Sequence, residues 1–386
     1  MESMPRSLFS AEHEAFREQV QRFCEKEIAP HHAQWEHAHG VPRPVWQAAG
    51  RNGLLCCWLP EEEGGPGGDL LFDIIVCEEL GRIGATGPGF PLHSVIVAPY
   101  IAHNGTELLR RKVLPAMASG DMIGAIVMTE PGAGSDLAGI RTRAERRGDG
   151  WVINGQKTFI TNGQNADVLV VACKTEPDRG AQGVSLFVVT SDMPGFTRGK
   201  NLHKIGQHAQ DTAELFFDNV EVPADHLLGE ENKGFRYLMR ELAQERLLVS
   251  VQCQARAQAV FETTVAYVKE RKVFGQRLAD LQNTRFKLGE LFAQLQAGRA
   301  YCDRLVELHL RGELDAAGAS AGKLWHSEML GRVTDECLQL HGGYGYMQEY
   351  AVARAYVDAR IERIYGGASE IMKEIIARKV CDEVAR

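Results

Sequence analysis

The sequence lacks three features that would point to an oxidising compartment, a metal-binding class or a membrane. It contains nine cysteines in 386 residues, an odd number, and none of them belongs to a CxxC pair. Structural zinc sites and thioredoxin-like redox sites depend on that spacing, so neither is expected. No apolar run approaches the length that crosses a bilayer, and the N-terminus lacks a secretory leader. We therefore expect buried free thiols in a protein of the bacterial cytoplasm or, if eukaryotic, of the mitochondrial matrix, without integral membrane insertion.

Basic residues are too few for a protein whose main partner is a nucleic acid. Lysine and arginine number 43 against 51 aspartate and glutamate residues, which gives a net charge of −8. Duplex binding needs a basic surface that displaces condensed counterions, so no nucleic-acid partner is expected. A Rossmann-type dinucleotide site is not expected either, because no GxGxxG follows a predicted strand. The segment 318–324 resembles a phosphate loop only superficially, since its spacing is one residue short and Leu324 replaces the magnesium-binding hydroxyl.

Four histidines lie close together in the sequence, at His31, His32, His37 and His39. They fall where a predicted helix ends in a loop, without the acidic and thiolate companions that a metal site needs. We expect surface histidines here, and we expect no metal site.

The first of three zones, residues 1–119, has the pattern of helices. The chain is 44% hydrophobic, which is enough to give each zone its own core. Ser10 is a candidate helix N-cap, and a further helix is predicted over 72–82. The segment 61–68 is expected to be a loop, because glycine and proline are too dense there for a helix.

The second zone, residues 120–232, has the pattern of strands. Short β-branched or aromatic runs bounded by turn residues occur at 151–160, 167–174, 184–190 and 214–222. No helix-length connections separate these runs, so we expect an antiparallel β-domain.

The third zone, residues 233–386, is helical again, with long stretches at 233–272, 280–311 and 315–340. Long helices joined by short loops favour an antiparallel four-helix bundle. The predicted fold class is therefore α+β and multidomain: an N-terminal helical domain, a middle antiparallel β-domain and a C-terminal four-helix bundle.

Three short phrases carry the functional signal. They are Met128–Asp136 (MTEPGAGSD), Thr158–Gly163 (TFITNG) and Ile364–Ile371 (IYGGASEI). Glycine-rich turns let main-chain N–H groups approach a ring or a phosphate closely, and Phe159 stands beside a hydroxyl at a strand end. Each phrase alone would be an ordinary turn. In this order and separation they resemble the flavin and thioester sites of the acyl-CoA dehydrogenase family.

The resemblance covers nearly the full length and implies the fold predicted above. It also implies a homotetramer with FAD held between the β-domain and the bundle, partly by a neighbouring subunit. For Arg271 it implies pairing with the FAD pyrophosphate, which suits a guanidinium; the alternative is a solvated helix charge. The positions that match the family's cofactor-binding residues are Ile126, Met128, Thr129, Gly134, Ser135, Phe159, Ile160, Thr161, Arg271, Phe274, Gln282, Gln339, Leu340, His341, Gly342, Gly343, Ala368, Ser369 and Glu370.

The catalytic base departs from the family's commoner pattern. Most members carry a glutamate directly after the tyrosine of the downstream phrase, where this chain has Gly366. A minority, resembling the long-chain and isovaleryl enzymes, place it on a bundle helix, and the matching residue is Glu245. Most helix neighbours of Glu245 are leucine or valine, so we expect an inward carboxylate with a raised pKa. The alternative is a surface glutamate paired with a cation.

The implied reaction is α,β-dehydrogenation of an acyl-CoA to the trans-2-enoyl-CoA in fatty acid β-oxidation, with electrons passed to electron-transferring flavoprotein. Glu245 is implied as the base and the main-chain N–H of Gly366 as a donor to the thioester oxygen. Arg246 is expected to contact either the CoA portion or the bundle wall. The positions implied to bind substrate are Ser135, Gly183, Val184, Arg236, Ala243, Gln244, Arg246, Gly366 and Gly367.

The local amino-acid sequence is most similar to that of the long-chain members of the family, especially over 311–315 and 340–347. Small residues in the segment 87–90 would leave a deep channel for an acyl tail, which favours medium or long chains. The alternatives are a branched-chain enzyme of the isovaleryl or citronellyl type, an acyl-CoA oxidase, and a non-catalytic binding module. A nitroalkane oxidase fits less well, because its carboxylate would stand at Gly366.

Overall fold

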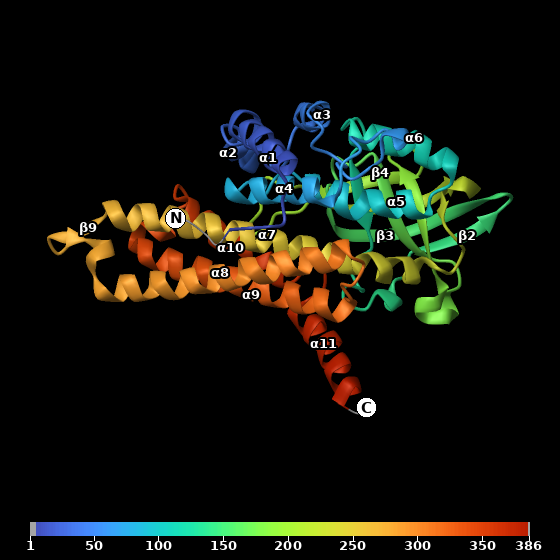
Figure 1. Cartoon of the computed structure of the whole chain (residues 1–386). Helices are drawn as coiled ribbons and strands as arrows, with labels where there is room; N and C mark the ends of the chain where they lie inside the picture. The colour runs from blue at the N-terminus through green and yellow to red at the C-terminus, as the bar shows by residue number, and fades with distance from the viewer. Residues whose placement is uncertain (1–4, 385–386) are drawn as a thin grey trace.

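The computed structural model describes residues 5–384 and shows three parts, helical, β and helical in chain order (Figure 1). The predicted fold class is confirmed. Ser10 caps the first helix as expected, because its hydroxyl accepts a hydrogen bond from the N–H of His13. The α-helices of the N-terminal part are α1 (Ala11–Phe23), α2 (His32–Ala38), α3 (Arg43–Arg51), α4 (Leu70–Arg82), α5 (Ala98–Asn104) and α6 (Glu107–Ala118).

The middle part is one eight-stranded sheet in the order β6-β7-β3-β2-β4-β5-β8, with β1 also paired to β4. Its strands are β1 (Gly124–Val127), β2 (Arg143–Arg147), β3 (Gly150–Thr161), β4 (Val168–Lys174), β5 (Val184–Thr190), β6 (Phe196–Asn201), β7 (Thr212–Val222) and β8 (Leu227–Leu228). Most pairs are antiparallel, but β4 pairs in parallel with β1 and, at one position, with β2. The expectation of purely antiparallel pairing was wrong there, because the β2–β3 hairpin, instead of a helix, connects β1 to β4.

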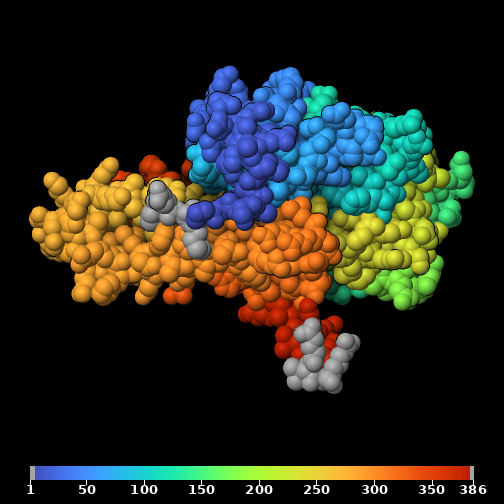
Figure 2. Space-filling model, in the orientation of Figure 1, coloured from blue at the N-terminus to red at the C-terminus, as the bar shows by residue number. Residues whose placement is uncertain are grey.

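The third part is built on three long helices, α7 (Gly234–Glu270), α8 (Gln282–Leu310) and α9 (Ala316–His341). A small hairpin of β9 (Lys272–Val273) and β10 (Gln276–Arg277) joins α7 to α8. The shorter α10 (Ala351–Ala359) packs on α9 and α7 as the fourth helix. The last helix, α11 (Ser369–Val384), projects away from the body of the molecule (Figures 1 and 2).

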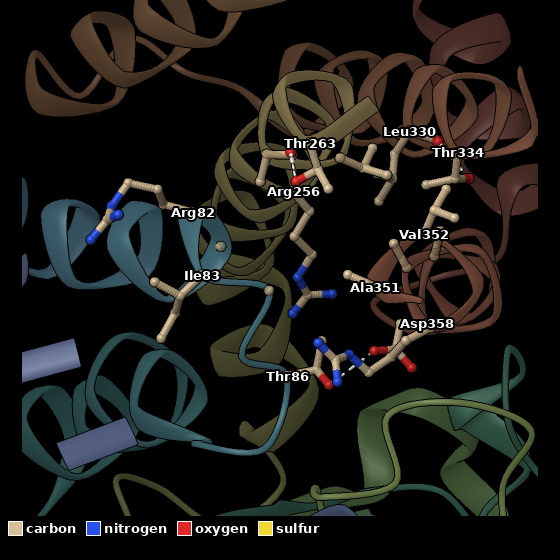
Figure 3. A pocket seen from close by; sticks show the side chains of 17 residues that line it. Arg82, Ile83, Thr86, Arg256, Thr263, Leu330, Thr334, Ala351, Val352 and Asp358 are labelled. Atoms are coloured by element: carbon tan, nitrogen blue, oxygen red, sulfur yellow. Dashed lines mark hydrogen bonds between the residues drawn. The ribbon is translucent and has the colours of Figure 1, made fainter. Parts of the chain in front are cut away.

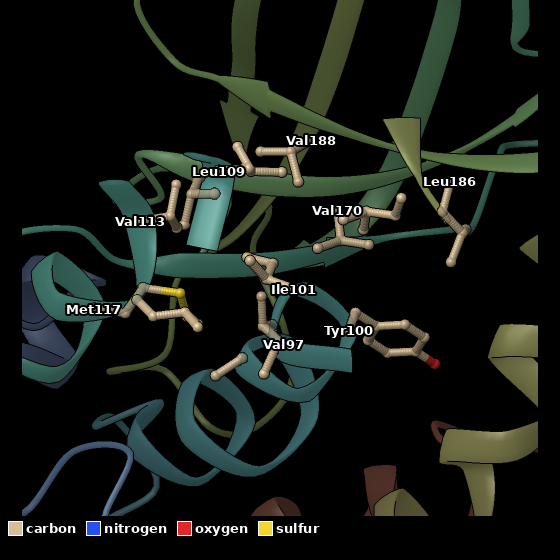
Figure 4. Packing of buried hydrophobic residues seen from close by; sticks show 14 of the residues in the cluster. Val97, Tyr100, Ile101, Leu109, Val113, Met117, Val170, Leu186 and Val188 are labelled. Carbon is tan, nitrogen blue, oxygen red and sulfur yellow. The ribbon is translucent and has the colours of Figure 1, made fainter. Parts of the chain in front are cut away.

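The apolar core that positions the site lies between the sheet and helices α5 and α6. Figure 4 shows side chains of α5 and α6 meeting those of β4 and β5. This packing fixes α5 against the sheet and leaves the other side of α5 facing α7. The buried members labelled there are Val97, Tyr100, Ile101, Leu109, Val113, Met117, Val170, Leu186 and Val188.

Two expectations about single residues were wrong. His32 is buried, and its ring accepts a hydrogen bond from the N–H of Gly87 at 3.1 Å. His31 and His37 are exposed as predicted, and His39 is half-buried. The cysteines are free thiols, but Cys381 is exposed because it lies on the projecting α11. Within residues 5–384, no helix has both the length and the apolar character needed to span a bilayer.

A buried ion cluster ties the N-terminal helices to the bundle. The carboxylate of Glu78 on α4 accepts hydrogen bonds from Arg6, Arg17 on α1 and Arg299 on α8, at 2.6–3.0 Å. Burial alone would raise the pKa of Glu78, but the charges of Arg299 and Arg6 outweigh burial and lower it from 4.5 to about 2. The cluster therefore stays ionised at neutral pH.

Replacing Glu78 by Gln should reduce the free energy of unfolding by about 3–5 kcal/mol, because three partly buried guanidinium groups lose their shared counter-charge. Urea denaturation at pH 7 measures this loss. The control is Glu18→Gln, which removes an exposed carboxylate 3.7 Å from Arg22 and should cost less than about 1 kcal/mol. Equal losses in the two variants would contradict this account of the cluster.

The stabilisation that Glu78 contributes depends on pH in a defined direction. The folded-state pKa of Glu78 lies below the unfolded value, so its stabilisation is present above pH 4.5 and is lost as the pH falls towards about 2.

Candidate active site

Helix α7 holds Glu245 on the face that meets α5. Glu245 is only 5% exposed, and the hydroxyl of Tyr100 on α5 donates a hydrogen bond to its Oε1 at 2.7 Å. In Figure 4 the Tyr100 hydroxyl points away from the apolar cluster towards the ribbon of α7. The predicted inward orientation of Glu245 is confirmed, and the alternative of a surface glutamate is excluded.

The environment of Glu245 raises its pKa from 4.5 to about 7. Burial is the largest cause, because a low-dielectric surrounding disfavours the charged carboxylate. The hydrogen bond from Tyr100 acts in the opposite direction, and the charge of Glu241, one helical turn away, raises the pKa further. A carboxyl group that titrates near neutral pH is suited to act as a general base.

The Gly366–Gly367 turn lies opposite the same face of α7. Both glycines have positive φ, at 62° and 100°, a region that disfavours other residues. A Cβ on Gly366 would have Val249 Cγ2 as its nearest neighbour, at 3.7 Å. Val249 lies one turn beyond Glu245 on α7, so the carboxylate and the turn face one space. A Cβ on Gly367 would instead lie 2.5 Å from Met372 Cε, so no side chain fits there without displacement.

Two buried cations lie beneath this turn. The ammonium group of Lys323 on α9 donates to the carbonyl oxygen of Gly367 at 2.7 Å. The guanidinium of Arg246 donates to Ser320 Oγ at 3.1 Å, and Arg246 is 4% exposed. These contacts place Arg246 in the bundle wall, one of its two predicted locations. Among the described residues, Arg246 Nε has no hydrogen-bond partner, so a buried donor is available to a ligand.

A buried ion pair holds the segment that leads into the Gly366–Gly367 turn. Glu362, fully buried three residues before Tyr365, pairs with Arg256 on α7. Figure 3 shows Arg256 pointing into a cavity of about 100 Å³ between α4, α7, α9 and α10, towards Thr86 and Asp358. None of the predicted site residues lines this cavity.

A buried lysine holds the main chain of the Met128–Asp136 loop. Lys157 Nζ donates to the carbonyl oxygens of Met128 and Ala172, both at 2.8 Å, and pairs with Glu130 at 2.9 Å. No atom lies within 4 Å of the position that a Cβ would take on Gly132 or Gly134. The loop therefore has a fixed base and an open outer side that a planar ring or a phosphate can approach closely.

A bulge in β3 turns Phe159 outward. The pairing of β3 with β7 shifts between Lys157 and Ile160, and Phe159 has φ 58° with 67% exposure. A bulge of this kind re-aims a side chain. Ile160 is 2% exposed within the sheet core, so only its main chain is available to a ligand, and the same holds for Val184 at 1%.

A second group of predicted cofactor residues lies at the far end of the bundle. A hollow of about 610 Å³ there is lined by Arg271 and by the segment 339–343. Phe274, at the tip of the β9–β10 hairpin, is 95% exposed. Arg271 stands about 39 Å from Glu245 along α7, from a rise of about 1.5 Å per residue. The predicted cofactor residues therefore fall into two separated groups within one chain.

The structure limits what several other predicted residues can contact. The amide of Gln244 bonds at both ends, donating to the Val95 carbonyl at 2.8 Å and lying 3.0 Å from His309 Nε2. The Ser369 hydroxyl donates to Glu328. Gly183 is buried, whereas Arg236 is exposed and Ala243 half-buried.

The expected channel at segment 87–90 is not supported. A Cβ on Gly89 would lie 2.4 Å from Asn162 Oδ1, and one on Gly87 would lie 2.6 Å from Ala209 Cβ. The space that the small residues leave is therefore filled by neighbouring side chains.

Sequence reasoning missed the side chains that surround Glu245 and the two glycine-rich turns. Tyr100, Lys157 and Lys323 belong to no motif, and Tyr100 is 145 residues from Glu245. Each acts through a contact between distant segments, which sequence spacing does not reveal.

The residues present fit a flavin dinucleotide. The Gly132–Gly134 turn is open, Phe159 presents an exposed ring, and Arg246 Nε is a buried donor without a described partner. Arg271 supplies a guanidinium beside the distant hollow, as a pyrophosphate would require.

Comparison with known proteins points to one family. The acyl-CoA dehydrogenase N-terminal, middle and C-terminal domain families match residues 10–121, 125–220 and 232–381. The mitochondrial long-chain specific acyl-CoA dehydrogenase of Mus musculus is 51% identical over 380 residues, 98% of this chain and 88% of that protein. An acyl-CoA dehydrogenase crystal structure from Geobacillus kaustophilus superposes with TM-score 0.96 at 48% identity, covering 97% of this chain and 100% of that one. A glutaryl-CoA dehydrogenase from Mycobacterium smegmatis in complex with FADH2 gives 0.89 at 30%, covering 97% and 95%.

Replacing Tyr100 by Phe should raise the pKa of Glu245 above about 7, by about one pH unit, because a donor to the charged carboxylate is lost. Infrared absorption of the protonated carboxyl group, compared with Glu245→Gln, measures this titration. The control is Tyr237→Phe, since the Tyr237 hydroxyl accepts from the N–H of Glu230 instead. An unmoved titration in Tyr100→Phe would show that this hydrogen bond does not control the base.

Proposed function

The chain belongs to the acyl-CoA dehydrogenase family, and we propose that Glu245 is the base of its FAD-dependent reaction. The protein is an oxidoreductase that acts on acyl-CoA thioesters. The observation that carries the assignment is one buried carboxylate, held by Tyr100, on the helix face that also meets the Gly366–Gly367 turn.

In the proposed mechanism, Glu245 removes the α-proton of the thioester. The acidity of that proton depends on stabilising the developing enolate oxygen, and the N–H of Gly366 is the proposed donor. One preorganised donor is worth about 3 kcal/mol, and a positioned base adds on the order of two to four powers of ten in rate. The FAD, when bound, supplies the acceptor for the β-hydride. Lys323 holds the carbonyl of Gly367 and so fixes the turn that carries the donor.

We propose that the working unit is an oligomer, and specifically the homotetramer implied by the resemblance. The Met128–Ser135 loop, Phe159–Thr161 and Ala368–Glu370 would hold the flavin of one subunit. Arg271 and the 339–343 hollow, about 39 Å away along α7, would serve the flavin of a neighbour. Phe274 and Gln282, both exposed, would be covered by that neighbour.

For the substrate we propose medium or long acyl chains, supported by the 51% identity with the long-chain specific enzyme of Mus musculus. Branched isovaleryl- or citronellyl-type thioesters are the alternative. An anaerobic flavin-bleaching series over short, long and branched acyl-CoAs tests this choice, and faster bleaching by a branched thioester than by any straight-chain one would overturn it.

We propose electron-transferring flavoprotein as the electron acceptor, in the bacterial cytoplasm or the mitochondrial matrix. Steady peroxide production without an added acceptor would instead favour an acyl-CoA oxidase. A colourless protein that cannot take up FAD would favour the non-catalytic module.

Replacing Glu245 by Gln should abolish the loss of flavin absorbance on adding an acyl-CoA while leaving FAD bound. The amide keeps the shape of the side chain but cannot accept the α-proton. Anaerobic stopped-flow absorbance measures the reduction, and the flavin-to-protein ratio measures binding. Reduction of the flavin at the parent rate would show that another group is the base.

A companion variant tests whether the turn shares the reaction centre. Adding Gly366→Glu to Glu245→Gln should restore part of the reduction rate, because the Cβ position on Gly366 is open. Only partial rescue is expected, since φ 62° is strained for a glutamate. A folded but fully inactive double variant would count against a shared centre.

A further inference from the structure

Helices α5 and α7 face each other with two matched hydrogen bonds. Tyr100 and His103 are three residues apart on α5, and Glu245 and Glu241 are four apart on α7, so each pair lies on one helix face. Tyr100 donates to Glu245 Oε1 at 2.7 Å, and His103 Nδ1 lies 3.0 Å from Glu241 Oε1. We call these contacts the inner and outer rungs.

The rungs differ in their access to solvent. Tyr100 and Glu245 are buried, at 0% and 5% exposure. In the outer rung the Glu241 side chain is 8% exposed but that of His103 is 46% exposed. The four side chains therefore form a polar line from a buried carboxylate to the surface.

The outer rung has the charges that proton transfer requires. Burial would raise the pKa of Glu241, but the hydrogen bond and charge of His103, together with Arg240 at 2.8 Å, lower it below its usual range. Glu241 is thus an ionised acceptor one turn from Glu245. His103 is the exposed member of this line, so its ring is the one in contact with bulk water.

A base buried to this extent needs a route for its proton. Each turnover would leave Glu245 protonated, and the bound thioester would exclude water from its side of the carboxyl group. We propose that Glu241 and His103 carry this proton to solvent, which makes them relay residues for the base. This inference rests on the proposed role of Glu245. It adds the path by which that residue loses its proton and becomes a base again.

The transfer balances without any added reagent. Glu245 in its acid form gives its proton to the Glu241 carboxylate, through one water between the two carboxyl groups. Glu241 passes this proton to Nδ1 of neutral His103 in the tautomer that carries its hydrogen on Nε2. His103 then releases the Nε2 proton to bulk water, and rotation of the exposed ring restores the starting tautomer. Arg240 stays charged throughout and keeps Glu241 ionised between transfers.

Another histidine contacts the same helix and provides a matched control. His309 on α8 lies 3.0 Å from the Gln244 amide oxygen, and burial lowers its pKa. A carboxamide cannot pass a proton as a carboxylate does, so this contact is not a second route.

The test uses an acyl-CoA analogue with sulfur in place of the β-carbon, which can lose its α-proton but has no β-hydride to give. The holoenzyme is held in excess in D2O, so that the analogue stays bound. Mass spectrometry then gives the rate at which deuterium enters the α-position. Absorbance on mixing gives the rate of α-proton removal itself, and the ratio of the two rates is the readout.

In His103→Ala and in Glu241→Gln, this ratio should fall by about tenfold or more, because the proton returns from Glu245 to the analogue before it can exchange. Glu241→Asp should retain part of the ratio, and added imidazole should restore it in His103→Ala. His309→Phe should leave the ratio unchanged.

An unchanged ratio in His103→Ala would overturn the relay, and so would a loss that imidazole does not restore. A parallel fall of both rates, with the ratio constant, would also overturn it by showing a structural effect on the base. Failure of the proposed function would give a different result. In that case the Glu245→Gln variant would still remove the α-proton of the analogue.

Discussion

The structure depends on burying the carboxylate of Glu245 without a full counter-charge. Glu78 and Glu245 are equally buried, at 5% exposure, yet their pKa values are lowered to about 2 and raised to about 7. Three arginines surround Glu78, whereas Glu245 receives one phenol hydrogen bond and faces the negative charge of Glu241. Burial costs the same kind of desolvation in both places, so the partners decide the result. One carboxylate joins two parts of the molecule, and the other is left able to take a proton.

The main chain around the buried carboxylate of Glu245 must be held in place by other segments. The turn opposite Glu245 consists of two glycines at positive φ, a conformation that must be held from outside. Lys323 and the Arg256–Glu362 pair do this from beneath, through contacts between α7, α9 and the segment before the turn. Lys157 has the same function under the Met128–Asp136 loop. Buried cations thus fix the main chain at both glycine-rich phrases, while the Cβ positions of Gly132, Gly134 and Gly366 stay open.

Patterns local in sequence predicted much of this arrangement, and contacts between distant segments account for most of the rest. Helical and strand periodicity predicted the three parts, and the leucine and valine neighbours of Glu245 predicted its burial. Parallel pairing of β1 with β4 was missed because the rule used was that parallel strands need a helical crossover, whereas a hairpin connects these two. The small residues at Gly87 and Gly89 suggested empty space, but Ala209 and Asn162 fill it. Tyr100, Lys157 and Lys323 were missed because each joins segments that no motif connects.

The length of α7 links this local chemistry to assembly. The helix carries the carboxylate near one end and leads directly into Arg271 at the other, about 39 Å away. A continuous helix packed against α9 cannot shorten this separation of Glu245 from Arg271. If both groups of predicted cofactor residues bind FAD, each must be completed by another copy of the chain. The exposed Phe274 at the hairpin tip and the projecting α11 are then surfaces that a neighbour covers. Under the proposed assembly, the same rigid helix that buries Glu245 would make the cofactor site a property of the oligomer.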